Sequence, residues 1–261
     1  MVVADLQCVW ITRPKHQSQD LNDLVKKQGF QVLSFPVIEI QTISDSEKLQ
    51  YLFSDINHYD TIIFVSRNAV EVTFKYYLSH EKLPQHIKFM AMGGATAAAL
   101  TDVGIETSLT GGKCADSESL LSLVELKKDS VQGKCILLIR GCGGRELIPD
   151  TLIERGAIVD VAEVYSRDVP VYDVQYLNSI WQTKPPQAII VTSNTGINNL
   201  ISLTPESHKA TLFKTPLVLM SIRNAEHAKL QGFDNEIRIA TTTDNGGLLK
   251  ALNSLWETSR T

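Results

Sequence analysis

The sequence lacks the features that mark several large classes of protein. Its four cysteines show neither paired CxxC spacing nor the density of a disulfide scaffold, which argues against a zinc site of that kind and favours a reducing compartment. No apolar stretch reaches the roughly 18 residues that a membrane-spanning helix needs. The first residues also lack the basic segment and apolar core of an export signal. We therefore expect a cytoplasmic protein that is neither exported nor inserted in a membrane.

The motifs of common cofactors and nucleophiles are missing as well. Residues 141–146 read G-x-G-x-x-E, so the third glycine of a dinucleotide-binding turn is absent, and there is no Walker loop. Neither G-x-S-x-G nor H-E-x-x-H occurs, and the histidines show no metal-ligand spacing. The formal net charge of -4 gives no general attraction to nucleic acid or to an anionic membrane. We expect chemistry without a metal, a cofactor or a covalent nucleophile, and no nucleic-acid or membrane partner.

What the sequence does contain is a long internal repeat. A shift of 127 residues places Ser66 on Ser193, and after one inserted residue a shift of 128 places Gly104 on Gly232. A shift that is kept across separate segments indicates a duplicated unit, and its period is far too long for a solenoid. A chain of 261 residues has room for two such units. We expect them to face each other across a cleft that could hold a sizeable ligand.

Short apolar runs alternate with stretches of helical spacing along both halves of the chain. The runs at 8–12, 61–65, 135–139 and 188–192 are typical of buried parallel strands. The helical stretches between strands end at glycine, as helices commonly do. The alternation predicts an α/β fold of two similar domains, each with a parallel sheet flanked by helices.

Two extended stretches, 33–42 and 161–170, break this alternation, and each contains a proline. They are equivalent within the repeat, where Ile38 falls on Tyr165, so they could pair as a two-stranded β ladder that joins the domains. The domains would then be discontinuous, with 1–36 and 171–261 as the first, 41–162 as the second, and 37–40 and 163–170 as the connector strands. A simple cut near residue 130 is the competing interpretation, and the periodicity does not choose between them.

Small polar residues follow the predicted strands at equivalent places in the repeat, where open parallel sheets bind their ligands. A serine at a helix start caps backbone donors, and the same donors bind carboxylates. A glycine there allows close approach of a ligand, or it simply forms a tight turn. Arginines near these ends can clamp carboxylates, although surface arginines are common. The candidate ligand-binding residues are Arg13, Ser66, Asn68, Gly93, Thr96, Arg140, Gly141, Arg145, Ser193, Ser221 and Arg223.

The order and spacing of these residues resemble the uroporphyrinogen-III synthase family over nearly the whole chain. The markers are Thr12-Arg13-Pro14, Pro36, and the segments 66–70, 93–97, 139–145, 156–159, 163–165 and 192–193. The resemblance implies two α/β domains joined by a two-stranded ladder, which favours the discontinuous arrangement. It also implies a monomeric, cofactor-free lyase of haem biosynthesis. Such an enzyme closes the linear tetrapyrrole hydroxymethylbilane, with loss of water and inversion of ring D, to give uroporphyrinogen III.

The resemblance further implies roles for particular residues. Tyr165 matches the family's tyrosine on the connector at the cleft edge, and a phenol can donate a proton to departing water. Packing beside the ladder is the simpler alternative for this residue. In the second copy of the Gly93 loop, the place of the family's usual serine or threonine is occupied here by Ser221-Ile222-Arg223-Asn224, which leaves open the hydroxyl or amide that reaches substrate there. A non-catalytic two-domain protein that binds a small anionic ligand is the alternative function, and a nucleotide-dependent transferase is disfavoured by the missing phosphate loops.

Overall fold

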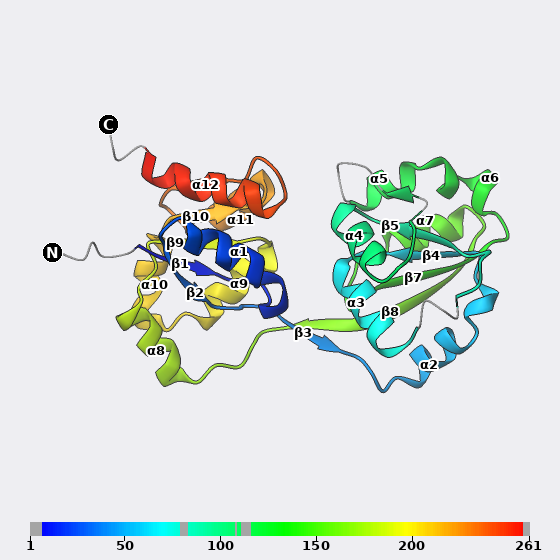
Figure 1. Cartoon of the computed structure of the whole chain (residues 1–261), viewed down its shortest axis with the longest axis horizontal. Helices are drawn as coiled ribbons and strands as arrows, with labels where there is room; N and C mark the ends of the chain where they lie inside the picture. The colour runs from blue at the N-terminus through cyan, green and yellow to red at the C-terminus, as the bar shows by residue number, and fades with distance from the viewer. Residues whose placement is uncertain (1–6, 79–82, 108, 111–115, 258–261) are drawn as a thin grey trace. The chain divides into compact units, whose positions relative to one another are not determined.

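The computed structural model describes residues 7–78, 83–107, 109–110 and 116–257 of the 261-residue chain (Figure 1). It divides into two compact units, one of Met1–Glu39 with Asp168–Thr261 and the other of Ile40–Arg167. The second unit is therefore inserted into the sequence of the first. In the described residues, the cysteines are free, no helix is long and apolar enough to cross a membrane, and no cluster of acidic, histidine and cysteine side chains could hold a metal.

The first unit is a parallel sheet with helices on both faces. Its strands are β1 (Cys8–Ile11), β2 (Gln31–Ser34), β9 (Ala188–Val191), β10 (Leu217–Leu219) and β11 (Ile237–Ile239), in the order β11-β10-β9-β1-β2. Its helices are α1 (Lys15–Lys27), α8 (Val174–Thr183), α9 (Asn194–Leu203), α10 (Glu206–Phe213), α11 (Ile222–Leu230) and α12 (Asn245–Glu257). Alternate residues of β1 enter opposite cores, since Trp10 packs toward α8 and α9 while Val9 and Ile11 pack toward α1 and α12.

The second unit repeats this plan around its own sheet. Its strands are β3 (Glu39–Thr42), β4 (Thr61–Phe64), β5 (Lys88–Ala91), β6 (Leu109–Thr110), β7 (Cys135–Gly141) and β8 (Ile158–Asp168), in the order β3-β8-β7-β4-β5-β6. Its α-helices are α2 (Glu47–Ser54), α3 (Arg67–Tyr76), α4 (Gly94–Asp102), α5 (Ser117–Ser122), α6 (Lys128–Val131) and α7 (Leu147–Glu154), and short 3-10 turns lie at Ile56–His58 and Val124–Leu126. One core joins the sheet to α2, α3 and α4, and the other joins it to α5 and α7.

The sequence repeat is a repeat of the fold. The order β6-β5-β4-β7-β8 in the second unit matches β11-β10-β9-β1-β2 in the first, strand for strand. The helix ends match too, because Gly29 after α1 and Gly156 after α7 both have φ of 88°. Glycine adopts this left-handed conformation without steric cost and so ends a helix. The prediction of two similar α/β domains is confirmed.

The insertion begins and ends on neighbouring strands of the second sheet. The chain enters this unit through β3 and leaves it through β8, which lie side by side in the sheet. Just past β3, the Ile43 amide donates to the Val164 carbonyl of β8 at 3.0 Å. Residues immediately before β3 belong to the first unit, since Val37 lies in its core and Ile38 packs against that core. Strand β8 has 11 residues, against 4 in its counterpart β2, and the extra length carries Tyr165.

Candidate active site

The second unit brings Tyr165, Ser66 and Gly141 together at one end of its sheet. Tyr165 lies on β8, Gly141 ends the adjacent strand β7, and Ser66 follows β4, the next strand in the sheet. Gly141 is the register partner of Tyr165. A Cβ atom on Gly141 would lie only 2.6 Å from the Tyr165 Cζ atom. The glycine therefore lets the tyrosine ring lie across β7 and reach Ser66.

The Tyr165 hydroxyl has two hydrogen-bond partners among the described residues. Its oxygen lies 3.0 Å from Ser66 Oγ and accepts a hydrogen bond of 2.5 Å from Arg167 Nη2. The Arg167 guanidinium also lies over the tyrosine ring, 5.0 Å from its centroid, in cation–π range. The Tyr165 side chain is 0% exposed, whereas Arg167 is exposed and Ser66 is half-buried. The phenol thus lies beneath an arginine rather than open to solvent.

Ser66 connects this tyrosine to a helix start. It is the N-cap of α3, and its Oγ accepts a hydrogen bond of 3.1 Å from the Ala69 amide. Ser193 caps α9 in the same way, accepting from Gly196 N at 3.0 Å. The capping interpretation of both serines is therefore correct, but only Ser66 also contacts a tyrosine. At the repeat shift of 127 residues, Ile38 is the residue that aligns with Tyr165.

Arg140 and Arg145 are already paired with carboxylates of the protein. Arg140 Nη2 lies 2.6 Å from Glu146 Oε1 and 3.1 Å from Glu163 Oε1, and the arginine side chain is only 8% exposed. Burial acts to lower the pKa of Arg140, but the two glutamates outweigh it and raise this pKa. Arg145 pairs with Glu118 at 2.8 Å on the surface. A ligand carboxylate could bind either guanidinium only by sharing it with these glutamates or displacing them.

The remaining candidates of the second unit lie on α3 and α4. Asn68 is half-buried in the first turn of α3. Gly93 is the N-cap of α4, and no side chain caps this helix. Its first amides are therefore the least satisfied by side chains among the four repeated helix starts. Thr96 is 5% exposed, so its side chain is buried.

The first unit places its candidates at the ends of β1, β9 and β10. Ser221 caps α11, where its Oγ accepts from Asn224 N at 3.2 Å and donates to Asn224 Oδ1 at 2.9 Å. Asn224 Nδ2 in turn donates to Asn194 Oδ1 at 2.7 Å. Arg13 donates to Asn245 Oδ1 at 2.7 Å, and burial lowers the pKa of this arginine. Arg223 is exposed and makes no hydrogen bond or ion pair with the described residues.

Comparison with known proteins supplies the family. The model of a protein family described as uroporphyrinogen-III synthase HemD matches residues 19–250 of the chain. The uroporphyrinogen-III synthase of Escherichia coli K12 is 32% identical over 246 residues, which cover 94% of this chain and 99% of that protein. The chain belongs to the uroporphyrinogen-III synthase family. The Salmonella typhimurium synthase is also 32% identical, over 253 residues that cover 94% of this chain and 99% of that protein.

Solved structures of uroporphyrinogen-III synthases have the same fold. A mutant of the Thermus thermophilus synthase superposes with a TM-score of 0.64 at 18% identity, covering 97% of this chain and 99% of that chain. The Helicobacter pylori synthase gives a TM-score of 0.63 at 16% identity, covering 96% and 99%. At these identities the likeness establishes architecture alone. The alternative of a binding protein gains no support from these relatives.

Sequence reasoning missed Arg167 as a residue of this synthase-family site. Residues i and i+2 of a strand lie on the same face of a sheet, and Arg167 is two residues after Tyr165 on β8. That spacing is the signal in the sequence that could have indicated the contact. Because arginines are common on protein surfaces, Arg167 did not stand out in the sequence as a partner of Tyr165.

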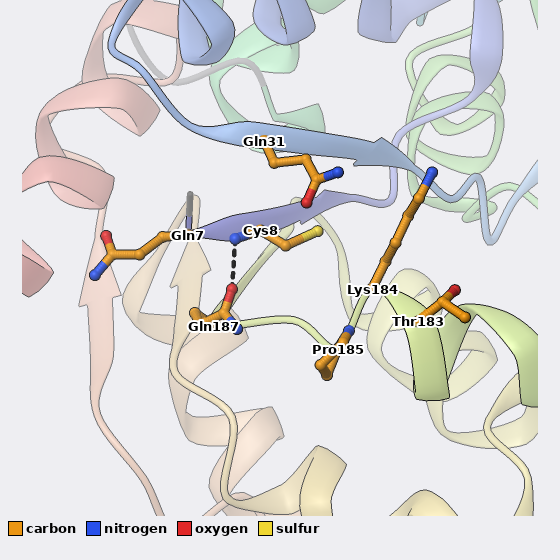
Figure 2. Close-up of a pocket in the computed structure, with 7 residues that line it drawn as sticks. All are labelled: Gln7, Cys8, Gln31, Thr183, Lys184, Pro185 and Gln187. Atoms are coloured by element: carbon orange, nitrogen blue, oxygen red, sulfur yellow. Dashed lines mark hydrogen bonds between the residues drawn. The ribbon is translucent and has the colours of Figure 1, made fainter. Parts of the chain in front are cut away.

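A pocket elsewhere on this synthase-family fold contains none of the candidate residues. It has a volume of about 360 Å³ and lies at the amino ends of β1 and β2, opposite the strand ends that carry the candidates (Figure 2). The Gln187 side chain in this pocket accepts a hydrogen bond from the Cys8 amide (Figure 2), and burial raises the pKa of the Cys8 thiol. The pocket is lined by Gln7, Cys8, Gln31, Thr183, Lys184, Pro185 and Gln187. We therefore exclude it from the candidate active site.

Proposed function

We propose that the protein is a uroporphyrinogen-III synthase. It would convert hydroxymethylbilane to uroporphyrinogen III, with inversion of ring D and loss of water, and without a cofactor. The observation that carries this proposal is the 32% identity to the Escherichia coli synthase, because the match covers 94% of this chain and 99% of that enzyme. An alignment of that length spans both units, including the insertion of the second unit in the sequence of the first.

Substrate carboxylates are held, in this proposal, by the helix starts that follow the strands. Amides at a helix start carry partial positive charge and bind anions. The repeated starts of α3, α4, α9 and α11 supply such donors in both units, and α4 has no side-chain cap to compete with a ligand. Since the net charge of the protein is -4, the protein as a whole does not attract an anionic substrate, and these local donors must bind its carboxylates. Arg13 and Arg223 add positive charge without first releasing a protein carboxylate.

Tyr165 is the proposed acid. Departure of the terminal hydroxyl as water requires a proton and leaves a protonated azafulvene, which the substituted carbon of ring D attacks to form a spiro intermediate. Fragmentation and reclosure then invert the ring. A phenol held by Ser66 and Arg167 can supply the proton. A Tyr165→Phe variant should lose on the order of tenfold to a hundredfold in rate, the low end for general acid catalysis.

The test is direct synthesis. Freshly prepared hydroxymethylbilane is incubated with the protein, and the type I and type III uroporphyrinogens are oxidised to porphyrins and resolved chromatographically. We expect type III to dominate with the native protein and type I to dominate in the no-enzyme and heat-denatured controls. Type III that fails to exceed these controls would overturn the proposed function. The proposal also includes a cytoplasmic location and a monomeric state. Gel filtration tests the monomer, which should elute near the chain mass of 29.0 kDa.

A further inference from the structure

The proposed acid has no open surface of its own. Tyr165 is 0% exposed, and its hydroxyl is engaged by Ser66 and Arg167. Ser66 is the half-buried member of this group, at the start of α3 where substrate is proposed to bind. Building on the proposed synthase function, we propose that Tyr165 delivers its proton through the Ser66 hydroxyl, and that Arg167 positions the pair. Ser66 is then the catalytic residue that contacts the leaving hydroxyl, and Tyr165 returns a proton to Ser66 Oγ.

The donors and acceptors around the two hydroxyls permit the direction that this relay requires. A guanidinium has donors only, so the Tyr165 oxygen must accept from Arg167. The Ala69 amide also only donates, so Ser66 Oγ must accept from it. When the phenol donates to Ser66 Oγ, the serine oxygen accepts two hydrogen bonds and its own proton has no acceptor among the described residues. That proton is the one available to a substrate.

The relay balances over the proposed reaction. The Ser66 proton moves to the departing hydroxyl oxygen as its bond to carbon breaks, and water leaves. The Tyr165 proton moves to Ser66 Oγ, which leaves a phenolate beside the Arg167 guanidinium at 2.5 Å. When the macrocycle closes, the carbon of ring D that forms the new bond loses its proton, and this proton restores the phenol through Ser66. The products are uroporphyrinogen III and water, and no oxidant, reductant or further reactant is consumed.

Arg167 acts in this scheme through Tyr165, as a positioning residue. Because it can only donate, it keeps the phenol proton directed away from itself and toward Ser66. Its charge is opposite to that of the transient phenolate and acts at hydrogen-bond distance. In the first unit, a capping serine occurs without the tyrosine partner that the relay needs. Ser193 has the same capping bond, but the repeat shift of 127 residues aligns Ile38, and not a tyrosine, with Tyr165.

A double-mutant cycle separates the relay from direct donation by the phenol. The variants are Ser66→Ala, Tyr165→Phe and their combination, measured by the rate of type III formation. If the proton passes through both residues, each single variant loses a similar factor and the double variant loses no more than either one. Near-native rate in Ser66→Ala, or losses that multiply in the double variant, would overturn the relay while leaving the synthase function intact. A native protein that forms no type III would instead reject the function itself.

Two further variants guard against a trivial loss of structure. Ser66→Thr keeps both the hydroxyl and the cap, so it should fold and retain most of the rate. Ser46→Ala removes a comparable cap from α2 in the same unit, where Ser46 Oγ accepts from Leu49 N at 3.3 Å without a tyrosine partner. It should lower the unfolding midpoint as Ser66→Ala does while keeping the native rate. Equal rate losses in Ser46→Ala and Ser66→Ala would reduce the serine's role to capping and overturn the proposal.

The role of Arg167 is tested by the way its loss divides between kcat and KM. Arg167→Gln should lower kcat with little change in KM, and Arg167→Lys should recover part of kcat because the donor and charge return. Added guanidinium should raise the rate of Arg167→Gly, whereas urea at the same concentration should not. A raised KM with native kcat would show that Arg167 binds a substrate carboxylate instead, and native values for both would show that it does not act on Tyr165. Either result overturns its positioning role.

Discussion

Replacing Gly141 by alanine is the sharpest structural test of the Tyr165 arrangement. A Cβ atom at this position would lie 2.6 Å from Cζ, 2.7 Å from Cε2 and 2.9 Å from the hydroxyl oxygen of Tyr165. Ordinary contacts begin at about 3.4 Å, so the ring or strand β7 must move by about 0.8 Å. The ring is fully buried and has no free space to enter without disturbing its neighbours.

This displacement is large enough to affect both stability and chemistry. Overpacking of a buried site costs about 1–3 kcal/mol, and we expect a loss in this range from the unfolding free energy. The Ser66 to Tyr165 separation of 3.0 Å exceeds the usual hydrogen-bond limit after a shift of about 0.6 Å away from the serine. The rate of Gly141→Ala should therefore fall toward that of Tyr165→Phe. Urea unfolding followed by circular dichroism gives the first quantity, and type III formation from hydroxymethylbilane gives the second.

Two controls isolate the collision from the general effect of a Gly→Ala change. Gly94, near the start of α4, has nothing within 4 Å of a built Cβ atom and has no positive φ, so Gly94→Ala should not destabilise the unit. Tyr165→Leu removes the contacted atoms, and the cost of Gly141→Ala should largely disappear in that background. A Gly141→Ala protein with native stability and native rate would refute the account of this glycine.

Three other outcomes follow from the structure. Asp60 accepts hydrogen bonds from Lys134 Nζ and Cys135 N, both at 2.9 Å, which hold the pKa of its carboxyl below the usual 3.8. Because the pKa of Asp60 is lower in the folded protein than in the unfolded chain, its ionised carboxylate stabilises the fold above the unfolded pKa, and this contribution is lost as the pH falls through the folded pKa. The native protein should therefore lose more unfolding free energy between about pH 6 and about pH 3 than Asp60→Asn does, as measured by urea unfolding. An equal loss in the two proteins would contradict this. Gly29→Ala and Gly156→Ala should each destabilise by about 1–2 kcal/mol because both glycines have φ of 88°, and thermal unfolding that matches the native protein would argue against equivalent helix ends. The Cys8 thiol is 3% exposed with a pKa raised by burial, so iodoacetamide should modify it at neutral pH only after unfolding, as mass mapping would detect; rapid labelling of the folded protein would count against its burial.

The fold was accessible from sequence because its determinants are local and occur twice. The apolar runs, the capping serines Ser66 and Ser193, and the glycines Gly29 and Gly156 each specify a strand, a helix start or a helix end by short-range physics. Because these signals recur at a constant shift, together they predict the duplicated fold more specifically than any one signal does. The same strand order in both sheets confirms that inference.

The contacts within the candidate site were not accessible in this way, because they join residues far apart in the chain. Ser66 and Tyr165 are separated by 99 positions, and their hydrogen bond depends on three strands being adjacent and on Gly141 having no side chain. The arginines show the same limit. Arg140 could be placed at a strand end from sequence, but its pairing with Glu146 and Glu163 depends on the register of β7 against β8. Composition carries no information about that register.

The position of β1 also determines the order in which this protein can fold during synthesis. Strand β1 is made first, yet it lies inside its sheet between β2 and β9, and β9 begins only at Ala188. The inserted unit ends at Arg167 and so leaves the ribosome complete while the first unit still lacks β9, β10 and β11. Domains usually fold in order from the N-terminus. Here we expect the reverse, with the first strands waiting unpaired on one side until the last third of the chain emerges.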